Sequence, residues 1–432
     1  MLKPETRNQK PETRNPTDAP PIARNVPLRF SVFAEYGITP GKGTEERKGR
    51  HMMKRFAGWA VAVACAGAVQ AATLFVETET FSDKGGWVVD QQFMDQMGSP
   101  FLMAHGLGTP VADASTTVEV PERGSYRVLV RTRNWAALWT QKDAPGQFKV
   151  NVNGTPLPAV LGTQGNEWAW QEAGHVRLEK GPARLALHDL TGFNGRCDAL
   201  ILTTDTAFTP ENEVSKLESY RRSVGAIKAS QRTEAVDLII AGGGIPGVCM
   251  AIAAARLGLT VALIQDRPVL GGNNSSEVRV HLAGRMNLPP FPRLGDVVSE
   301  IGPRRGGNAQ PGDYYEDARK IEAVKAEKNI RLFLSTRALA VEKEGARITA
   351  VVGRHIETGQ ETRFTAPLVA DCTGDGVIGM LAGAEYRYGR ESKEETGEST
   401  APDKADSQTM GSSVQWYSRE AEEPVAFPDI AW

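Results

Sequence analysis

The feature that most constrains this chain is a glycine-rich turn between a short apolar run, residues 236–241, and a helical run of small residues. Gly242, Gly244 and Gly247 stand in a G-x-G-x-x-G spacing directly after the apolar run, and a second apolar run follows at 260–264. The order strand, glycine turn, helix and strand predicts a parallel βαβ unit. In such a unit the glycines permit a tight turn, close approach of a pyrophosphate, and close packing of helix on strand. The sequence therefore predicts an α/β dinucleotide-binding fold.

The helix expected at 248–257 would present free N–H groups and its positive dipole end to the phosphates of the dinucleotide. The residue expected to hold the ribose lies at the end of the second strand. There the chain has Gln265 and Asp266 in place of the usual glutamate. Because an amide also forms hydrogen bonds with hydroxyl groups, we assign both residues to the cofactor site.

A second motif separates a flavin cofactor from a nicotinamide cofactor. Arg267, Leu270, Gly271 and Gly272 form an R-x-x-L-G-G pattern after the second strand, and Asn273 follows it. The pattern resembles that of glutathione-reductase-like FAD proteins. In those proteins the glycine pair lets the chain pass close to the cofactor, which implies the same role for this segment.

A third motif comes later in the chain. Thr373, Gly374 and Asp375 lie in the segment L-V-A-D-C-T-G-D-G, residues 368–376, which resembles the segment of the same proteins that returns to the FAD after a β-meander. Residues 235–432 resemble the bacterial FAD-dependent oxidoreductase family related to heterodisulfide reductase A-like flavoproteins. The resemblance implies FAD as the cofactor and an α/β Rossmann-like domain of glutathione-reductase type.

Composition sets limits on partners and cofactors. The 432 residues allow two to three domains, and a hydrophobic content of 41% is ordinary for a globular protein. A net charge of −2 gives no basic excess, so no nucleic-acid partner is expected. No C-x-x-C pair exists, so the iron–sulfur clusters of the heterodisulfide reductase relatives have no local ligand motif here. Cys249 and Cys372 are expected to be buried small hydrophobic residues rather than redox thiols.

The N-terminal segment resembles an extension followed by an export signal. Residues 1–51 contain a repeated K-P-E-T-R-N and many prolines and charges, which predicts disorder, and we interpret them as a spurious extension from an upstream start. Residues 52–71 have the basic start, apolar segment and small-residue cleavage site of a secretory signal peptide. The apolar run is too short for a membrane anchor, so we expect a periplasmic or extracellular protein with no membrane span after cleavage. A lipoprotein signal through Cys65 is a poorer match, because Ala62 stands where leucine is preferred.

Residues 72–204 show short alternating strands separated by Gly and Asn turns, for example at 124–131 and 148–154. This alternation predicts an antiparallel β-sandwich. The expected first and last strands, 75–79 and 197–202, resemble those of jelly rolls of the carbohydrate-binding-module type, including domains attached to golvesin and xanthan-lyase-type proteins. The resemblance implies a glycan partner for this domain.

Two groups of side chains in the sandwich are candidates for binding. Glu77 and Glu79 are expected on one face of the first strand, and with Asp198 they offer the hard oxygens that suit a calcium ion. The alternative is that the two glutamates are exposed strand carboxylates. Five of the eight tryptophans also fall here, and since core packing is their commoner use, at most one or two would line a ligand site.

The segment 277–285 offers the candidate catalytic residues. Apolar and polar residues alternate along it, so we expect a strand whose polar side chains project together beside the flavin. His281 would then take a hydroxyl proton while hydride leaves for the flavin. Arg279 or Arg285 would hold an anionic group of the substrate. The alternative is a solvated polar face of a strand.

The remaining segments complete a multidomain organisation. Residues 205–234 are expected to form a linker with one helix at 212–227, followed by the FAD-binding domain at 235–392. Within that domain we expect a long loop at 287–313 that could act as a lid. The other expected elements are a helix at 314–329, meander strands at 330–335, 338–344, 347–354 and 360–364, a returning strand at 368–372 and a helix ending at 382.

Residues 393–432 resemble the opening of a substrate domain, and we interpret the chain as a truncated member of its family. Two functions follow from these patterns. The first is an exported FAD-dependent oxidoreductase that acts on a carbohydrate or another hydroxyl-bearing small molecule by hydride transfer to the flavin. The second is a non-catalytic product that works only as a glycan-binding module. The sequence leaves the electron acceptor open.

Overall fold

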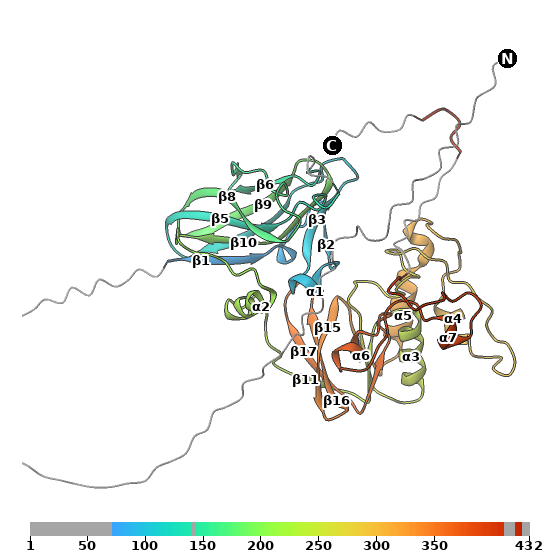
Figure 1. Cartoon of the computed structure of the whole chain (residues 1–432). Helices are drawn as coiled ribbons and strands as arrows, with labels where there is room; N and C mark the ends of the chain where they lie inside the picture. The colour runs from blue at the N-terminus through green and yellow to red at the C-terminus, as the bar shows by residue number, and fades with distance from the viewer. Residues whose placement is uncertain (1–70, 140–143, 410–419, 426–432) are drawn as a thin grey trace, which may run out of the picture. The chain divides into compact units, whose positions relative to one another are not determined.

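The computed structural model describes residues 71–139, 144–409 and 420–425 (Figure 1). The extension expected at 1–51 and nearly all of the signal peptide expected at 52–71 lie outside the described residues, so both stay predictions. The described residues all belong to one compact unit, Ala68–Trp432. None of the helices in this part of the chain is long and apolar enough to cross a membrane.

The first half of the described chain contains two antiparallel sheets. One sheet has the order β2-β3-β10-β5-β8, with β1 also paired to β10, and the other has the order β4-β9-β6-β7. The strands are β1 (Thr73–Glu77), β2 (Trp87–Asp90), β3 (Phe101–His105), β4 (Ala114–Val120), β5 (Gly124–Thr132), β6 (Phe148–Val152), β7 (Thr155–Pro156), β8 (Ala169–Leu178), β9 (Gly181–Asp189) and β10 (Phe193–Thr203). Alternate residues of both sheets, such as Val128, Val130, Leu185 and Leu200, form one buried core. This packing is the reason for the period-two pattern in the sequence.

The first strand ends earlier than expected. β1 stops at Glu77, and the short 3-10 helix η1 (Thr78–Thr80) follows it. The Thr80 hydroxyl donates a hydrogen bond to the Glu77 carbonyl oxygen at 2.7 Å, and this turn carries Phe81 into the core. Glu77 and Glu79 therefore do not share a strand face, and neither is exposed, since they are only 6% and 4% accessible. Both expectations for this pair were wrong.

Two short helices accompany the sandwich. Helix α1 (Met94–Met97) lies in the loop after β2, and helix α2 (Val214–Ser223) occupies the segment between β10 and the glycine-rich turn. The helix expected at 212–227 is shorter at both ends: Glu213 accepts a hydrogen bond from the Ser215 N–H and caps α2 at its N-terminus, and the helix ends at Ser223, before Gly225 with a φ of 75°.

A fully parallel sheet surrounds the glycine-rich turn. Its order is β14-β13-β12-β18, with β12 (Leu238–Ala241), β13 (Val261–Ile264), β14 (Ile330–Phe333) and β18 (Leu368–Asp371). Helix α3 (Ile245–Arg256) connects β12 to β13, as the βαβ pattern predicted. Helices α4 (Asp296–Ile301) and α5 (Asp317–Ala326) contact α3, and apolar side chains of α3, α5 and the sheet form a shared core.

A second sheet follows the order β11-β17-β16-β15 and comprises β11 (Thr233–Ala235), β15 (Thr336–Glu344), β16 (Arg347–His355) and β17 (Glu361–Thr365). The antiparallel strands β15, β16 and β17 are the meander (Figure 1). The segment expected as its first strand, 330–335, instead forms β14 of the parallel sheet. Ile330 and Leu332 pack on the apolar core beneath α3, whereas Phe333 faces the core of the meander side, so β14 is covered on both faces.

Three further expectations differ from the structure. The segment 277–285 contains no strand: Arg279 has a left-handed φ of 64°, and its carbonyl oxygen accepts hydrogen bonds from the Tyr315 hydroxyl and the Ala309 N–H. The expected loop at 287–313 contains α4. The helix expected at 314–329 is split, because Glu316 has a φ of 46° between η2 (Gly312–Tyr315) and α5. The last helices are α6 (Val377–Leu381) and α7 (Lys393–Thr396).

Candidate functional site

Two glycines of the turn between β12 and α3 are required by the packing of the chain itself. Gly242 has a φ of 104°, and a Cβ atom there would lie 2.1 Å from the carbonyl oxygen of Cys372. At Gly247 a Cβ atom would lie 1.9 Å from the carbonyl oxygen of Gly242. These approaches bring α3, β12 and the segment after β18 together, so a side chain at either position would force the backbone to move.

Gly244 is different from both. Its φ is −64°, which any residue adopts, and the nearest atom to a Cβ placed there is Pro246 Cδ at 3.7 Å. Gly244 is also the N-cap of α3 and forms a β-bridge with Gly271. The protein alone would therefore accept a methyl group at this position. A ligand that approaches the backbone closely is the reason that remains for a glycine here.

Gly244 lines a groove of about 660 Å³, a volume within the range of small-molecule sites. The groove lies where β12, β13 and β18 end, and this edge of an open parallel sheet is where such folds bind ligands. It brings together most of the residues that the sequence assigned to the cofactor and one assigned to catalysis: Gly242, Gly244, Gln265, Asp266, Arg267, Gly271, Gly272, Asn273, Thr373, Gly374, Asp375 and His281. Gly247, Arg279 and Arg285 do not line it.

Gln265 has a different role from the one expected. Its side chain is buried, its Oε1 accepts a hydrogen bond from the Gly243 N–H at 2.7 Å, and its Nε2 donates to the Val269 carbonyl oxygen at 3.3 Å. The amide thus holds the glycine turn to the end of β13 and is not directed to a ribose. Asp266 is the remaining acidic side chain of the groove at this strand end.

Two arginines accompany the Asp266 carboxyl. Burial raises the pKa of Asp266, and the positive charges of Arg337 and Arg267 oppose that rise. Arg267 is itself held by both carboxylate oxygens of Glu277, at 2.8 and 2.9 Å. Arg337 lines the groove from β15, and it donates a hydrogen bond to Asp95 at 2.6 Å. Sequence reasoning missed Arg337, because no local pattern indicates that the first meander strand reaches the groove.

The segment after β18 is held by hydrogen bonds among its own residues. Burial alone would raise the pKa of Asp371, but hydrogen bonds from the Thr373 hydroxyl at 2.6 Å and from the Thr373 and Gly379 N–H groups lower it. The Thr373 hydroxyl accepts in turn from the Val377 N–H at the start of α6. Gly374 has a φ of 89°, and a Cβ atom placed there would have no neighbouring atom within 4 Å. The loop is therefore fixed while its outer side stays open to the groove.

His281 lies in the groove on an exposed loop rather than on a strand. Its backbone N–H donates to Asn308 Oδ1 at 2.6 Å, and its Nδ1 accepts from the Gly307 N–H at 3.2 Å. In the neutral ring the proton is then on Nε2, so this nitrogen is a hydrogen-bond donor. Arg279 donates from Nε to the Ser276 carbonyl oxygen, and Arg285 is exposed outside the groove lining.

The three carboxylates expected to bind calcium are arranged around arginines. Arg221 Nε donates to Glu77 at 2.5 Å, Arg221 Nη2 lies 3.1 Å from Asp198, and Arg131 Nη1 lies 2.7 Å from Asp198. Among the described residues no group of three or more His, Cys, Asp or Glu side chains is placed to hold a metal. Because guanidinium groups occupy the positions that a cation would take, the structure does not support the calcium hypothesis.

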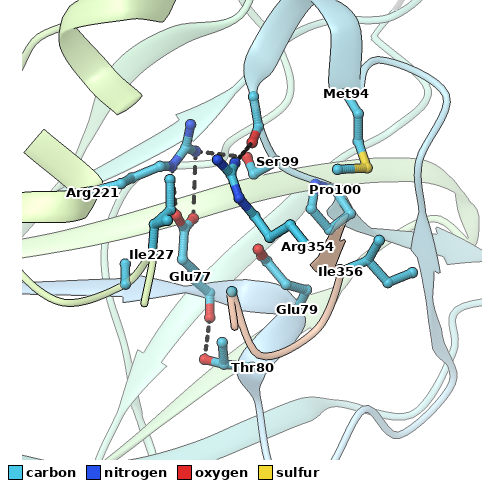
Figure 2. Close-up of a pocket in the computed structure, with 13 residues that line it drawn as sticks. Glu77, Glu79, Thr80, Met94, Ser99, Pro100, Arg221, Ile227, Arg354 and Ile356 are labelled. Atoms are coloured by element: carbon cyan, nitrogen blue, oxygen red, sulfur yellow. Dashed lines mark hydrogen bonds and ion pairs between the residues drawn. The ribbon is translucent and has the colours of Figure 1, made fainter. Parts of the chain in front are cut away.

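Glu79 belongs to a small cavity beside these ion pairs, with a volume of about 20 Å³, which is room for one water molecule. Figure 2 shows Glu77, Glu79, Arg221 and Arg354 around it. Burial raises the pKa of Glu77 to about 7 against the opposing charge of Arg221. Burial, with the charge of Glu77, raises the pKa of Glu79 well above its ordinary value. A raised pKa disfavours the charged carboxylate that calcium prefers as a ligand.

A parallel βαβ unit, glycines at its turn and a groove across the strand ends are features of dinucleotide-binding folds. Residues 237–429 match the family model described as FAD dependent oxidoreductase. This match supports the FAD-dependent oxidoreductase family for the C-terminal part of the chain, and with it FAD as the cofactor. The clearance at Gly244 and the volume of the groove fit such a group. No curated protein matches the chain.

Several solved structures are weakly similar. One is a family 35 carbohydrate binding module from Clostridium thermocellum, at 15% identity over 30% of this chain and 97% of that chain, with a TM-score of 0.25. Another is a geranylgeranyl bacteriochlorophyll reductase-like protein from Thermoplasma acidophilum, at 17% identity over 36% and 43% of the two chains, with a TM-score of 0.24. A third is the 3-ketosteroid-delta4-(5alpha)-dehydrogenase from Rhodococcus jostii, at 14% over 33% and 48%, with a TM-score of 0.26. The chain spans less than half the length of the latter two proteins, and these scores carry no functional argument.

Proposed function

We propose that this chain binds FAD in the groove at the ends of β12, β13 and β18 and acts as an oxidoreductase on a hydroxyl-bearing small molecule. The observation that carries the proposal is Gly244, where the protein leaves room for a side chain and yet has none. A pyrophosphate that lies against this backbone at the N-terminus of α3 accounts for the glycine. FAD, when bound, supplies a hydride acceptor that no amino-acid side chain provides.

The residues of the groove have distinct roles in this proposal. The free N–H groups at the first turn of α3 bind the phosphates, with Pro246 contributing no donor. Asp266 accepts hydrogen bonds from the ribose hydroxyl groups, in place of the glutamate that is usual at this strand end. Gly271 and Gly272, with φ values of 114° and 58°, let the chain pass close to the cofactor. Thr373, Gly374 and Asp375 complete the groove on the side of β18.

The finer parts of the proposal rest on the sequence patterns. We infer that the FAD-binding region is of glutathione-reductase type and is related to heterodisulfide reductase A-like flavoproteins. We infer also that the protein is exported and that the sandwich holds a carbohydrate-like substrate near the redox domain. The presence of a β-sandwich directly before the FAD-binding region supports that arrangement.

His281 is proposed as the group that takes the hydroxyl proton during oxidation. Because its Nδ1 accepts the Gly307 N–H and Nε2 carries the proton of the neutral ring, proton uptake occurs at Nδ1 and requires that this hydrogen bond break. His281→Ala should slow reduction of the bound flavin by about 10²- to 10⁴-fold. His281→Gln separates two roles, since an amide donates a hydrogen bond but does not accept the proton. Full activity in His281→Gln would show that the histidine only positions the substrate.

The test of the proposed function is a spectrum of the purified chain after incubation with FAD and removal of the free cofactor. Bound flavin absorbs near ~450 nm, and anaerobic addition of sugars and sugar alcohols should bleach this band for at least one substrate class. Protein that carries flavin but is not bleached by any hydroxyl compound would contradict the substrate class alone. Protein that never retains flavin would contradict the proposed function itself.

A further inference from the structure

Two arginines on the six-stranded sheet of the sandwich lie around the same aromatic ring. Arg133 follows β5 directly, and Arg196 lies in β10. Their guanidinium carbons are 5.2 and 5.5 Å from the centroid of the Phe93 ring. Arg196 is also 5.7 Å from the centroid of Trp135. The two cations are therefore brought together from neighbouring strands, although like charges repel each other.

Neither arginine has an acidic partner within salt-bridge distance in the described part of the chain. Glu167 acts on Arg133 and Asp90 acts on Arg196 only as more distant charges. Burial, followed by the charge of Arg133, lowers the pKa of Arg196 to about 10, and the charge of Asp90 opposes this shift. By contrast, Arg131 and Arg221 beside the same sheet have carboxylates at 2.7 and 2.5 Å.

The same place has buried hydrogen-bond donors without acceptors. Among the described residues the Nε atoms of Arg133 and Arg196 and the Nε1 atom of Trp168 are buried and have no hydrogen-bond partner. The Trp168 ring lies 6.2 Å from the Phe93 ring, so all three donors belong to one cluster. Arg133 is only 8% accessible. Since buried donors are nearly always satisfied, three orphaned donors around one ring indicate a missing acceptor.

We propose that Arg133 and Arg196 bind the oxyanion of a small ligand, a carboxylate or sulfate carried by a saccharide. A guanidinium group pairs with two oxygens of a carboxylate or sulfate through two parallel hydrogen bonds, and the anion compensates the positive charge that the protein leaves unbalanced. The side chains of Phe93 and Trp135 are partly exposed beside the two guanidinium groups, and their exposed parts provide apolar contact for the body of a sugar. The site is in the sandwich and does not depend on the flavin proposal.

The test is calorimetric titration of the full chain at low salt with a hexuronate, a sulfated hexose, inorganic sulfate and the neutral hexose. We expect saturable binding of at least one acidic sugar and none of the neutral hexose. Inorganic sulfate as a competitor reports how much of the binding comes from the oxyanion alone. Arg196→Met should weaken binding at least about 10-fold, because a charge-assisted hydrogen bond is lost. Arg127→Met is the matched control on β5, since Arg127 is already paired with Glu172.

Two results would overturn the proposal: no acidic ligand binds, or Arg196→Met binds as tightly as the wild type. If Arg196→Met does not fold, arginine modification of the wild-type protein by phenylglyoxal gives the answer independently. Mass spectrometry should find Arg196 modified in the free protein and protected by the acidic sugar. Equal modification with and without that sugar would refute the site.

Discussion

The groove at the glycine-rich turn and the cavity beside Glu79 differ in how their polar groups are satisfied. The groove is about 660 Å³ and is lined largely by glycines and loop residues, with the first turn of α3 at its edge. The cavity is about 20 Å³, and at its edge Arg221 pairs with Glu77 while Arg354 donates a hydrogen bond to the Gly98 carbonyl oxygen (Figure 2). The cluster around Arg221 therefore stabilises the fold, whereas the groove, with free backbone N–H groups at its edge, has room for a ligand. Internal pairing, rather than the number of charges, separates structural clusters from binding sites.

Arg221 makes the ion pairs beside the Glu79 cavity, so its replacement should have the largest effect on stability. Its guanidinium binds Glu77, Asp198, Ser99 and the Met97 carbonyl oxygen, and it is 1% accessible. Arg221→Met should lower the free energy of unfolding by about 3–5 kcal/mol, because it leaves buried carboxylates without their partner. Urea denaturation measures the loss. Arg256→Met, which breaks a largely exposed pair, should cost at most about 1 kcal/mol, and equal losses in the two variants would contradict the comparison.

The three glycines of the turn allow a second comparison, between glycines that the packing of the chain requires and one that it does not. Gly242→Ala and Gly247→Ala should each lower the free energy of unfolding by about 2–4 kcal/mol, since a Cβ atom meets a backbone oxygen at 2.1 and 1.9 Å. Gly244→Ala should change it by less than about 0.5 kcal/mol, because the new methyl group meets no protein atom closer than 3.7 Å. Thermal unfolding without cofactor is the measurement. A similar loss for all three would show that Gly244 also serves packing.

Glu79 gives a smaller, pH-dependent effect. Burial raises the pKa of Glu77 from the ordinary 4.5 to about 7 and raises that of Glu79 well above 4.5, so the folded protein holds more protons than the unfolded chain above pH 4.5. The free energy of unfolding contributed by these groups therefore falls as pH rises through 4.5 to 7 and beyond. Glu79→Gln should flatten this fall and stabilise the protein by about 1–2 kcal/mol at pH 8.

Urea denaturation at pH 5, 6.5 and 8 measures the effect of Glu79→Gln. Glu179→Gln is the control, because Glu179 is in an exposed pair with Arg123. The same pH slope in wild type and Glu79→Gln would mean that Glu79 is charged in the folded protein at neutral pH.

Local patterns were sufficient for the βαβ unit and the alternating strands. The apolar runs at 236–241 and 260–264, with glycines between them, determine β12, α3 and β13 because each signal lies within a few residues. The same holds for the period-two strands of the sandwich. The glycines and the other cofactor residues of the groove followed from the order of three motifs along the chain, whereas Arg337 did not.

Interactions over long sequence separations were not visible in the sequence. Glu77 and Arg221 are 144 residues apart, so nothing local showed that the expected calcium ligands pair with arginines. Segment 330–335 has the composition of a meander strand. It belongs to the parallel sheet because its side chains pack against an apolar core on each face of that sheet. The alternation in 277–285 resembles a strand, yet Tyr315 and Asn308 hold this segment as a loop.

The central claim is that position 244 is a glycine because a bound dinucleotide lies close to its backbone. Titration of FAD into wild type, Gly244→Asp and Met250→Asp, followed by flavin fluorescence, tests it most directly. Met250 is exposed on α3 outside the groove lining, so it controls for added charge on this helix. We expect saturable binding to wild type and Met250→Asp, and none to a folded Gly244→Asp, whose carboxylate would meet the pyrophosphate with like charge. Equal FAD affinity in Gly244→Asp and wild type would contradict the account.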